Sequence, residues 1–186
     1  MARAFDTFIA PTLKKLPAWI TPNRVTIVRA FIMPLVVATQ AHPVIATTLF
    51  VIGCLLDALD GALARVRGPI TKLGQWLDPL VDKTHVHGTL WFACRNDVGL
   101  IICLIVSGID TALTITRFFK ERKGVGTQSN KWGGLKMWTQ SFAISFVLTR
   151  SAPFEPLVLP TFILAIALAY ASFVGHLYDF RRRPSI

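Results

Sequence analysis

Four aspartates lie close together in this 186-residue sequence, at Asp57, Asp60, Asp78 and Asp82. The first two are three residues apart and the last two are four apart, so on helices each pair shares one face. The sequence between the pairs contains a Gly-Pro dipeptide and basic residues, which are typical of a turn. We therefore expect two antiparallel helices whose acid pairs face each other near that turn.

These carboxylates need partners, because 53% of the residues in the chain are hydrophobic. Each acid inside a membrane costs about 2.5–3.5 kcal/mol on insertion scales unless a cation or water compensates it. Arg65 and Lys83 are too few to neutralise four acids. Carboxylate oxygens suit Mg²⁺ or Mn²⁺, and four of them on two helices can hold a pair of ions. Zinc fits less well, because no Cys or His is suitably spaced among the acids.

The segments that must position the acids are apolar and close to the roughly 20 residues that a membrane-spanning helix needs. Pro22 and Pro43 suit the first turn of a helix, where proline loses no hydrogen bond. We predict an all-α integral membrane protein with one domain over 1–186, consisting of an interfacial amphipathic helix over 1–20 and a six-helix bundle over 21–183. The expected spans lie near 22–40, 43–66, 72–93, 97–119, 132–150 and 157–180.

The first 20 residues do not resemble a signal peptide. Asp6 and Pro11 interrupt their apolar stretch, and no small-residue cleavage site follows. An interfacial helix fits better, and a frayed terminus is the alternative.

The formal charge of +10 is distributed between the apolar segments rather than along a stripe with aromatic residues. This distribution favours an anionic membrane surface and disfavours nucleic acid as a partner. By the positive-inside rule, both termini and the loops over 65–72 and 120–131 face the cytoplasm. The basic residues of these regions are Lys14, Lys15, Arg24, Arg65, Arg67, Lys72, Lys120, Arg122, Lys123, Lys131, Arg181, Arg182 and Arg183.

Small residues accompany the acids, and they permit either close helix packing or space for a bulky polar ligand. Together with the acids they form a fixed pattern: Asp57, Asp60, Gly61, Ala64, Arg65, Gly74, Asp78 and Asp82. This pattern resembles the signature of the CDP-alcohol phosphotransferase (CDP-alcohol phosphatidyltransferase) family. The resemblance implies six transmembrane helices, a homodimer and a metal site open to the cytoplasm. It also implies a reaction in which a hydroxyl attacks a phosphorus and displaces CMP.

The same resemblance implies a role for each residue of the pattern. Asp57, Asp60, Asp78 and Asp82 would bind the metal ions, and Asp82 would also act as the catalytic general base. Residues that would contact the CDP group are Asp57, Gly61, Ala64, Arg65 and Gly74.

Three further stretches are similar to bacterial phosphatidylglycerophosphate synthases: TPNRVTIVR at 21–29, LDPLVDK at 77–83 and NKWGGLKMWTQ at 130–140. These enzymes join CDP-diacylglycerol to sn-glycerol 3-phosphate, which implies those two substrates and a location in the bacterial inner membrane. Arg117, Lys136 and Gln140 match their pattern, whereas Ile109, Gly134 and Met137 depart from it. We expect Arg117, Lys131 and Lys136 to bind the acceptor phosphate.

Alternatives remain open at this level. The acceptor could be phosphatidylglycerol, inositol phosphate or serine. Arg117 and Lys136 could instead be cations that reach the membrane surface from helix ends. Outside enzymes, the acids could belong to a metal-binding membrane protein or transporter, in which case they should spread across the bilayer depth.

Overall fold

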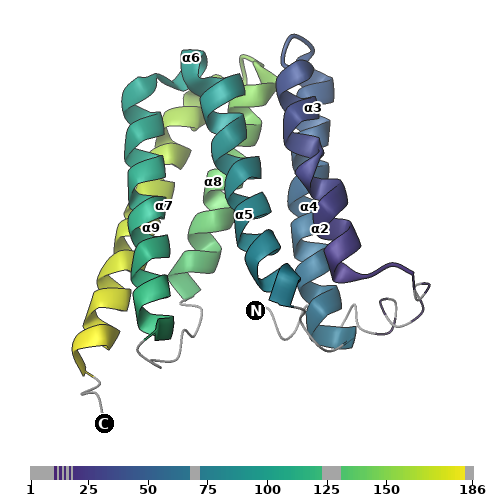
Figure 1. Cartoon of the computed structure of the whole chain (residues 1–186). Coiled ribbons are helices and arrows are strands. Elements are labelled where there is room, and N and C mark those ends of the chain that lie inside the picture. The colour runs from purple at the N-terminus through teal and green to yellow at the C-terminus, as the bar shows by residue number, and fades with distance from the viewer. Residues whose placement is uncertain are drawn as a thin grey trace. The chain divides into compact units, whose positions relative to one another are not determined.

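The computed structural model of the chain describes residues 11, 13, 15, 17, 19–67, 72–122 and 131–182. Within these ranges side chains are described except at residues 67, 72, 73, 75, 76, 117–122, 131 and 176–182. Every regular element in the described ranges is a helix, which confirms the all-α class (Figure 1). The expected interfacial helix over 1–20 lies largely outside the described residues.

The chain divides into two compact units, residues 1–93 and 94–186. The helices of the first unit are α2 (Pro22–Ala30), α3 (Ile32–Ala38), α4 (Pro43–Arg67) and α5 (Lys72–Thr89). A π-helix, η1 (Leu90–Cys94), continues α5 across the division. The helices of the second unit are α6 (Arg95–Val98), α7 (Leu100–Arg122), α8 (Lys131–Thr149) and α9 (Glu155–Arg182).

Five of the six predicted spans correspond to one long helix each, if η1 is counted with α5. The first, predicted over 22–40, is instead two helices interrupted at Phe31. Pro34 explains the interruption, because a proline ring clashes with the carbonyl four residues earlier and removes a helical N–H. The Phe31 N–H turns to the Val28 carbonyl at 3.1 Å, which tightens the last turn of α2.

Two of the described helices are long and apolar enough to cross a membrane, over Pro43–Val66 in α4 and Glu155–Gly175 in α9. The apolar part of α7, Leu100–Thr116, is shorter. Charge lowers the hydropathy of α5, which contains two lysines and two aspartates in its 18 residues. Large apolar side chains are nevertheless exposed on helices of both units, among them Leu35, Leu55, Ile101, Leu104 and Ile163. Such surfaces suit a lipid environment.

Both predicted proline starts are present, since α2 begins at Pro22 and α4 at Pro43. Thr21 caps α2, and its hydroxyl accepts a hydrogen bond from the Arg24 N–H at 3.4 Å. This cap fixes where the first turn starts and therefore which side chains of α2 face the neighbouring helices.

In the first unit, α2 and α3 pack against both α4 and α5, and they contact these helices more extensively than α4 and α5 contact each other. One close approach joins α4 and α5 directly. The His85 ring stacks on Phe50 with centroids 4.9 Å apart, and its Nε2 lies 3.2 Å from the Phe50 carbonyl oxygen. A Cβ at Gly53 would collide with this imidazole, so glycine is required there.

In the second unit, α9 packs against α7 and α8. Gly99 joins α6 to α7 with a φ of 85°, a conformation that glycine adopts without steric cost. Arg150 ends α8 with a φ of 46°, and its N–H donates to the Val147 carbonyl at 3.1 Å. The three cysteines, Cys54, Cys94 and Cys103, are free thiols.

Candidate active site

Three of the four predicted metal ligands meet at one point of the first unit. Asp57 and Asp60 come from α4 and Asp78 comes from α5, and one carboxylate oxygen of each lies within 4.8 Å of the others. The expectation that the acid pairs of two antiparallel helices face each other is confirmed for these three. Asp82, one turn beyond Asp78 on α5, is partly buried and is not a member of this group.

An arginine that the sequence motifs did not single out lies among these acids. The Arg29 side chain, on α2, is completely buried and forms ion pairs with all three carboxylates. Its Nη1 pairs with Asp57 and lies 3.7 Å from Asp60 Oδ2, while its Nη2 donates to Asp78 Oδ1 at 2.8 Å. Because α2 packs against both α4 and α5, it can present one guanidinium to acids of both helices.

Asp60 is the most deeply buried member of the group, with 2% of its surface exposed. The Thr26 hydroxyl donates to its Oδ2 at 3.1 Å. Its other oxygen, Oδ1, is buried and has no hydrogen-bond partner within the described part of the chain. A buried carboxylate oxygen without a hydrogen-bond partner destabilises the fold unless a cation or a donor reaches it. Three clustered carboxylates with such an oxygen fit a hard divalent cation.

The residues predicted to contact a nucleotide lie on the same two helices. Arg65 is exposed, and its Nη1 lies close to Gly61, where a Cβ would meet it at 3.3 Å. The guanidinium can therefore lie over Gly61, one turn beyond Asp57. Ala64 is partly buried and Gly74 is buried. The Arg65 cation can thus lie beside the acid cluster, over Gly61, which adds almost no side-chain bulk.

The residues predicted to bind an acceptor phosphate belong to the second unit. Lys136 of α8 is 13% exposed and pairs with Asp110 of α7, itself 5% exposed. Gln140, one turn after Lys136, is buried, and its Nε2 has no hydrogen-bond partner among the described residues. The side chains of Arg117 and Lys131 are not among those that the structure describes. The Lys136 charge is thus already compensated within the unit.

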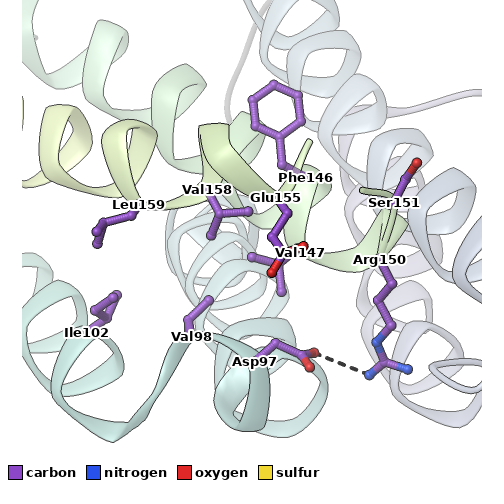
Figure 2. A pocket seen from close by; sticks show the side chains of 10 residues that line it. All are labelled: Asp97, Val98, Ile102, Phe146, Val147, Arg150, Ser151, Glu155, Val158 and Leu159. Carbon is purple, nitrogen blue, oxygen red and sulfur yellow. Dashed lines mark hydrogen bonds and ion pairs between the residues drawn. The ribbon is translucent and has the colours of Figure 1, made fainter. Parts of the chain in front are cut away.

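A separate cavity of about 520 Å³ lies in the second unit (Figure 2). An ion pair between Arg150 Nη2 and Asp97 Oδ2, 3.3 Å apart, forms part of its lining, and both side chains are partly exposed. None of the predicted site residues lines this cavity. Its lining consists of Asp97, Val98, Ile102, Phe146, Val147, Arg150, Ser151, Glu155, Val158 and Leu159.

Arg29 and Thr26 are the site residues that sequence reasoning missed. They are three apart in the stretch TPNRVTIVR, so they share one face of the helix that begins the predicted apolar span over 22–40. An ionisable residue inside an apolar span is itself a signal for a polar partner.

Within the described residues the fold is all-helical with two helices long and apolar enough to cross a membrane, and its clustered carboxylates are a candidate metal site. Comparison with known proteins is consistent with that class and refines it. The chain matches the family model described as CDP-alcohol phosphatidyltransferase over residues 19–174, and it belongs to that family.

Several curated relatives cover most of the chain. The CDP-diacylglycerol–glycerol-3-phosphate 3-phosphatidyltransferase of Bacillus subtilis is 28% identical, over 80% of this chain and 86% of the relative. A probable phosphatidylglycerophosphate synthase of Mycobacterium tuberculosis is 30% identical, over 84% of this chain and 77% of the relative. The CDP-diacylglycerol–inositol 3-phosphatidyltransferase of Saccharomyces cerevisiae is 36% identical over 77 residues, which are 41% of this chain and 35% of the relative.

Proposed function

We propose that this protein transfers the phosphatidyl group of CDP-diacylglycerol to sn-glycerol 3-phosphate, which forms phosphatidylglycerol phosphate and releases CMP. The observation that carries the proposal is the meeting of three motif aspartates, with oxygens within 4.8 Å of one another, in a chain of the CDP-alcohol phosphatidyltransferase family. The glycerol 3-phosphate acceptor is supported by the names of bacterial relatives that align over most of their length.

Asp57, Asp60, Asp78 and Asp82 would hold two divalent ions, Mg²⁺ or Mn²⁺. Ions bound there would supply charge neutralisation for the pyrophosphate and the leaving CMP. The unpartnered Oδ1 of Asp60 and the clustering of three carboxylates support this donor set. Asp82 is the one acid of the motif outside the three-residue cluster, which suits a separate role.

In that role Asp82 accepts the proton of the acceptor hydroxyl. The hydroxyl oxygen forms a bond to the phosphorus of the phosphatidyl group, and the bond from this phosphorus to the bridging oxygen breaks, with CMP as the leaving group. Arg65, exposed beside Gly61, donates charge-assisted hydrogen bonds to the CDP phosphates. Ala64 and Gly74 leave room for the nucleotide.

On the acceptor side, Lys136 binds the phosphate of glycerol 3-phosphate, with Arg117 and Lys131 as further cations. Asp110 supports this assignment because its ion pair fixes the Lys136 ammonium. A dianionic phosphate would approach an already oriented charge and share it with Asp110.

The decisive test is release of CMP by the detergent-purified full chain. We expect release only when CDP-diacylglycerol, glycerol 3-phosphate and Mg²⁺ or Mn²⁺ are all present. Asp97→Asn is the matched control, because it removes an aspartate outside the acid cluster and should keep activity. Equal release with an uncharged alcohol in place of glycerol 3-phosphate would contradict the acceptor but not the reaction class.

A second candidate acceptor is inositol. The local identity to the yeast inositol enzyme is higher than that to the bacterial relatives, although it covers a smaller part of the chain. Parallel assays with glycerol 3-phosphate, inositol, inositol phosphate, serine and phosphatidylglycerol separate these possibilities. The acceptor with the highest kcat/KM is the one that the site selects.

The protein works, by this proposal, as a homodimer in the bacterial cytoplasmic membrane with both termini and the active site facing the cytoplasm. Lysine and arginine in the predicted cytoplasmic regions support this orientation. In a cysteine-free background, an impermeant thiol reagent added to intact cells should label a cysteine at His42 and not one at Ser129. The opposite labelling pattern would reverse the orientation.

A further inference from the structure

Arg29 places a fixed positive charge beside the carboxylates of the proposed metal site. Its guanidinium takes one oxygen from each acid: Asp57 Oδ1, Asp60 Oδ2 and Asp78 Oδ1. A divalent ion bound by the same three carboxylates would therefore stand beside a cation of like charge. The role of Arg29 in metal binding rests on the proposed function, in which these acids hold the metal.

Arg29 has no alternative environment within the described part of its unit. The side chain has no exposed surface, so the guanidinium cannot exchange the acids for water without movement of α2. Its Nε is buried and has no hydrogen-bond partner among the described residues. Compensation of its charge therefore comes from the three acids, and a buried charge that loses its partners is strongly destabilising.

Two roles of Arg29 are compatible with this geometry, and they predict opposite changes in metal affinity when Arg29 is replaced. If Arg29 mainly orients the carboxylates, its loss should weaken metal binding, as loss of an outer-shell partner does. If Arg29 mainly supplies charge, its loss should tighten metal binding, because the acids would repel one another and a divalent ion would relieve that repulsion.

The burial favours the second role. Coulombic interactions strengthen as water is excluded, and the Arg29 and Asp60 side chains are 0% and 3% exposed, whereas those of Asp57 and Asp78 are 23% and 48% exposed. Orientation of Asp60 is already supplied by the Thr26 hydroxyl, at 3.1 Å from its Oδ2. We infer that Arg29 is an internal counter-ion that shares the three acids with the divalent metal and thereby lowers the metal affinity of the site. It keeps the acid cluster stable at low metal concentration and leaves the metal readily exchangeable.

The test is a Mn²⁺ titration of the detergent-purified full chain at fixed pH and ionic strength. Electron paramagnetic resonance measures the free and bound Mn²⁺. Arg29→Met removes the charge and keeps an extended apolar side chain. We expect its Kd for Mn²⁺ to fall at least about tenfold below the wild-type value, since a unit charge has been removed from beside the ion. Arg29→Gln, which retains hydrogen-bond donors, is the second variant and should change the Kd in the same direction.

Arg24→Met is the matched control. Arg24 lies on the same helix, is exposed, and donates from Nη1 to the Trp19 carbonyl at 2.9 Å instead of to an acid. Its loss should leave the Kd within about threefold of wild type, because charges at an exposed site are screened. A second readout is the melting temperature: Mn²⁺ should raise it more in Arg29→Met than in wild type, from a lower metal-free value.

The outcomes distinguish failure of the counter-ion role of Arg29 from failure of the proposed metal site. If wild type binds Mn²⁺ and neither folded Arg29 variant binds it more tightly, the counter-ion role is wrong and the metal site stands. If wild type and Asp57→Asn take up Mn²⁺ equally poorly, the proposed metal site itself fails. An equally large fall of the Kd for Mn²⁺ in Arg24→Met would also overturn the inference. Loss of any positive charge from the protein would then explain the effect.

Discussion

Arg29 and Arg150 both pair with aspartates, and their burial differs. Arg29, in the first unit, is fully buried against three carboxylates from two helices. Arg150, in the second unit, is 41% exposed and pairs with one carboxylate, Asp97, which is 39% exposed (Figure 2). The first arrangement excludes water from the arginine and from Asp60, although Asp57 and Asp78 are 23% and 48% exposed, and the second leaves both partners in contact with the surroundings.

The difference indicates what each arrangement can do. An exposed pair contributes typically 0–1 kcal/mol to stability and can be lost at little cost. A buried cluster carries a large desolvation penalty, and removal of one partner leaves a charge uncompensated. Stability alone does not explain such a cluster, and the reason we propose is metal and pyrophosphate chemistry. The expected effects of substitution decrease in the same order, from the buried cluster to the exposed pair.

The largest effect is expected at the buried cluster. Asp60→Asn removes a proposed metal ligand and one of three partners of Arg29. CMP release should fall by at least about 100-fold, because even loss of an outer-shell metal partner costs 10–100-fold. The melting temperature should also fall.

The control for this prediction is Asp97→Asn, the same substitution at the exposed pair. It should keep activity within about twofold. Comparable activity losses in the two variants would remove the distinction between the regions.

Asp82→Asn tests the acid that lies outside the cluster of three. A general base contributes typically 10²–10⁴-fold, so turnover should fall by at least about 10²-fold while binding of CDP-diacylglycerol changes less. Turnover is measured as CMP release at saturating substrates, and binding by a lipid-competition assay. Near-normal release would exclude Asp82 as the base.

Much of the helical architecture was predictable, because apolar segment length and proline position determine it. Pro22 and Pro43 start helices as expected, and five spans correspond to single long helices. The interruption at Phe31 was missed, although Pro34 lies within reach of the carbonyl four residues earlier. Apolar length predicts one span over 22–40, because hydropathy does not register a local steric clash.

The site was predictable to the extent that helical periodicity fixes it. Spacings of three and four placed Asp57 with Asp60, and Asp78 with Asp82, on shared faces, and the structure brings three of the four together. Arg29 was not predicted because it lies far from them in sequence and reaches them only through the packing of α2 on α4 and α5. Likewise, the pairing of Lys136 with Asp110 depends on two helices whose contact no local pattern specifies.

The Lys136 side chain is intermediate in burial between those of Arg29 and Arg150. The expected effect of replacing Lys136 is also intermediate. Lys136→Met should raise the KM for glycerol 3-phosphate by about tenfold or more, as loss of a charge-assisted contact of roughly 1.5–3 kcal/mol implies. The KM for CDP-diacylglycerol should change little, and both constants come from initial rates of CMP release.

Because Lys136→Met leaves the Asp110 carboxylate buried without its partner, the double variant Lys136→Met with Asp110→Asn is the companion measurement. It should recover stability and still show the raised KM. A KM that returns to the wild-type value in the double variant would assign Lys136 a purely structural role.

The smallest effect concerns Arg150, where the backbone and the ion pair act in opposite directions. Its φ of 46° lies in the left-handed region, which costs a non-glycine residue roughly 1–2 kcal/mol. Its ion pair with Asp97 is exposed and contributes no more than about 1 kcal/mol. Arg150→Gly removes both, and since the relief exceeds the loss, the melting temperature should rise slightly or stay level. Arg150→Ala loses the ion pair and keeps the unfavourable φ, so it should melt below wild type, and CMP release should be unchanged in both variants. If Arg150→Gly melts lower than Arg150→Ala, the exposed pair is not the weak interaction that its burial indicates, and the contrast with Arg29 must rest on chemistry alone.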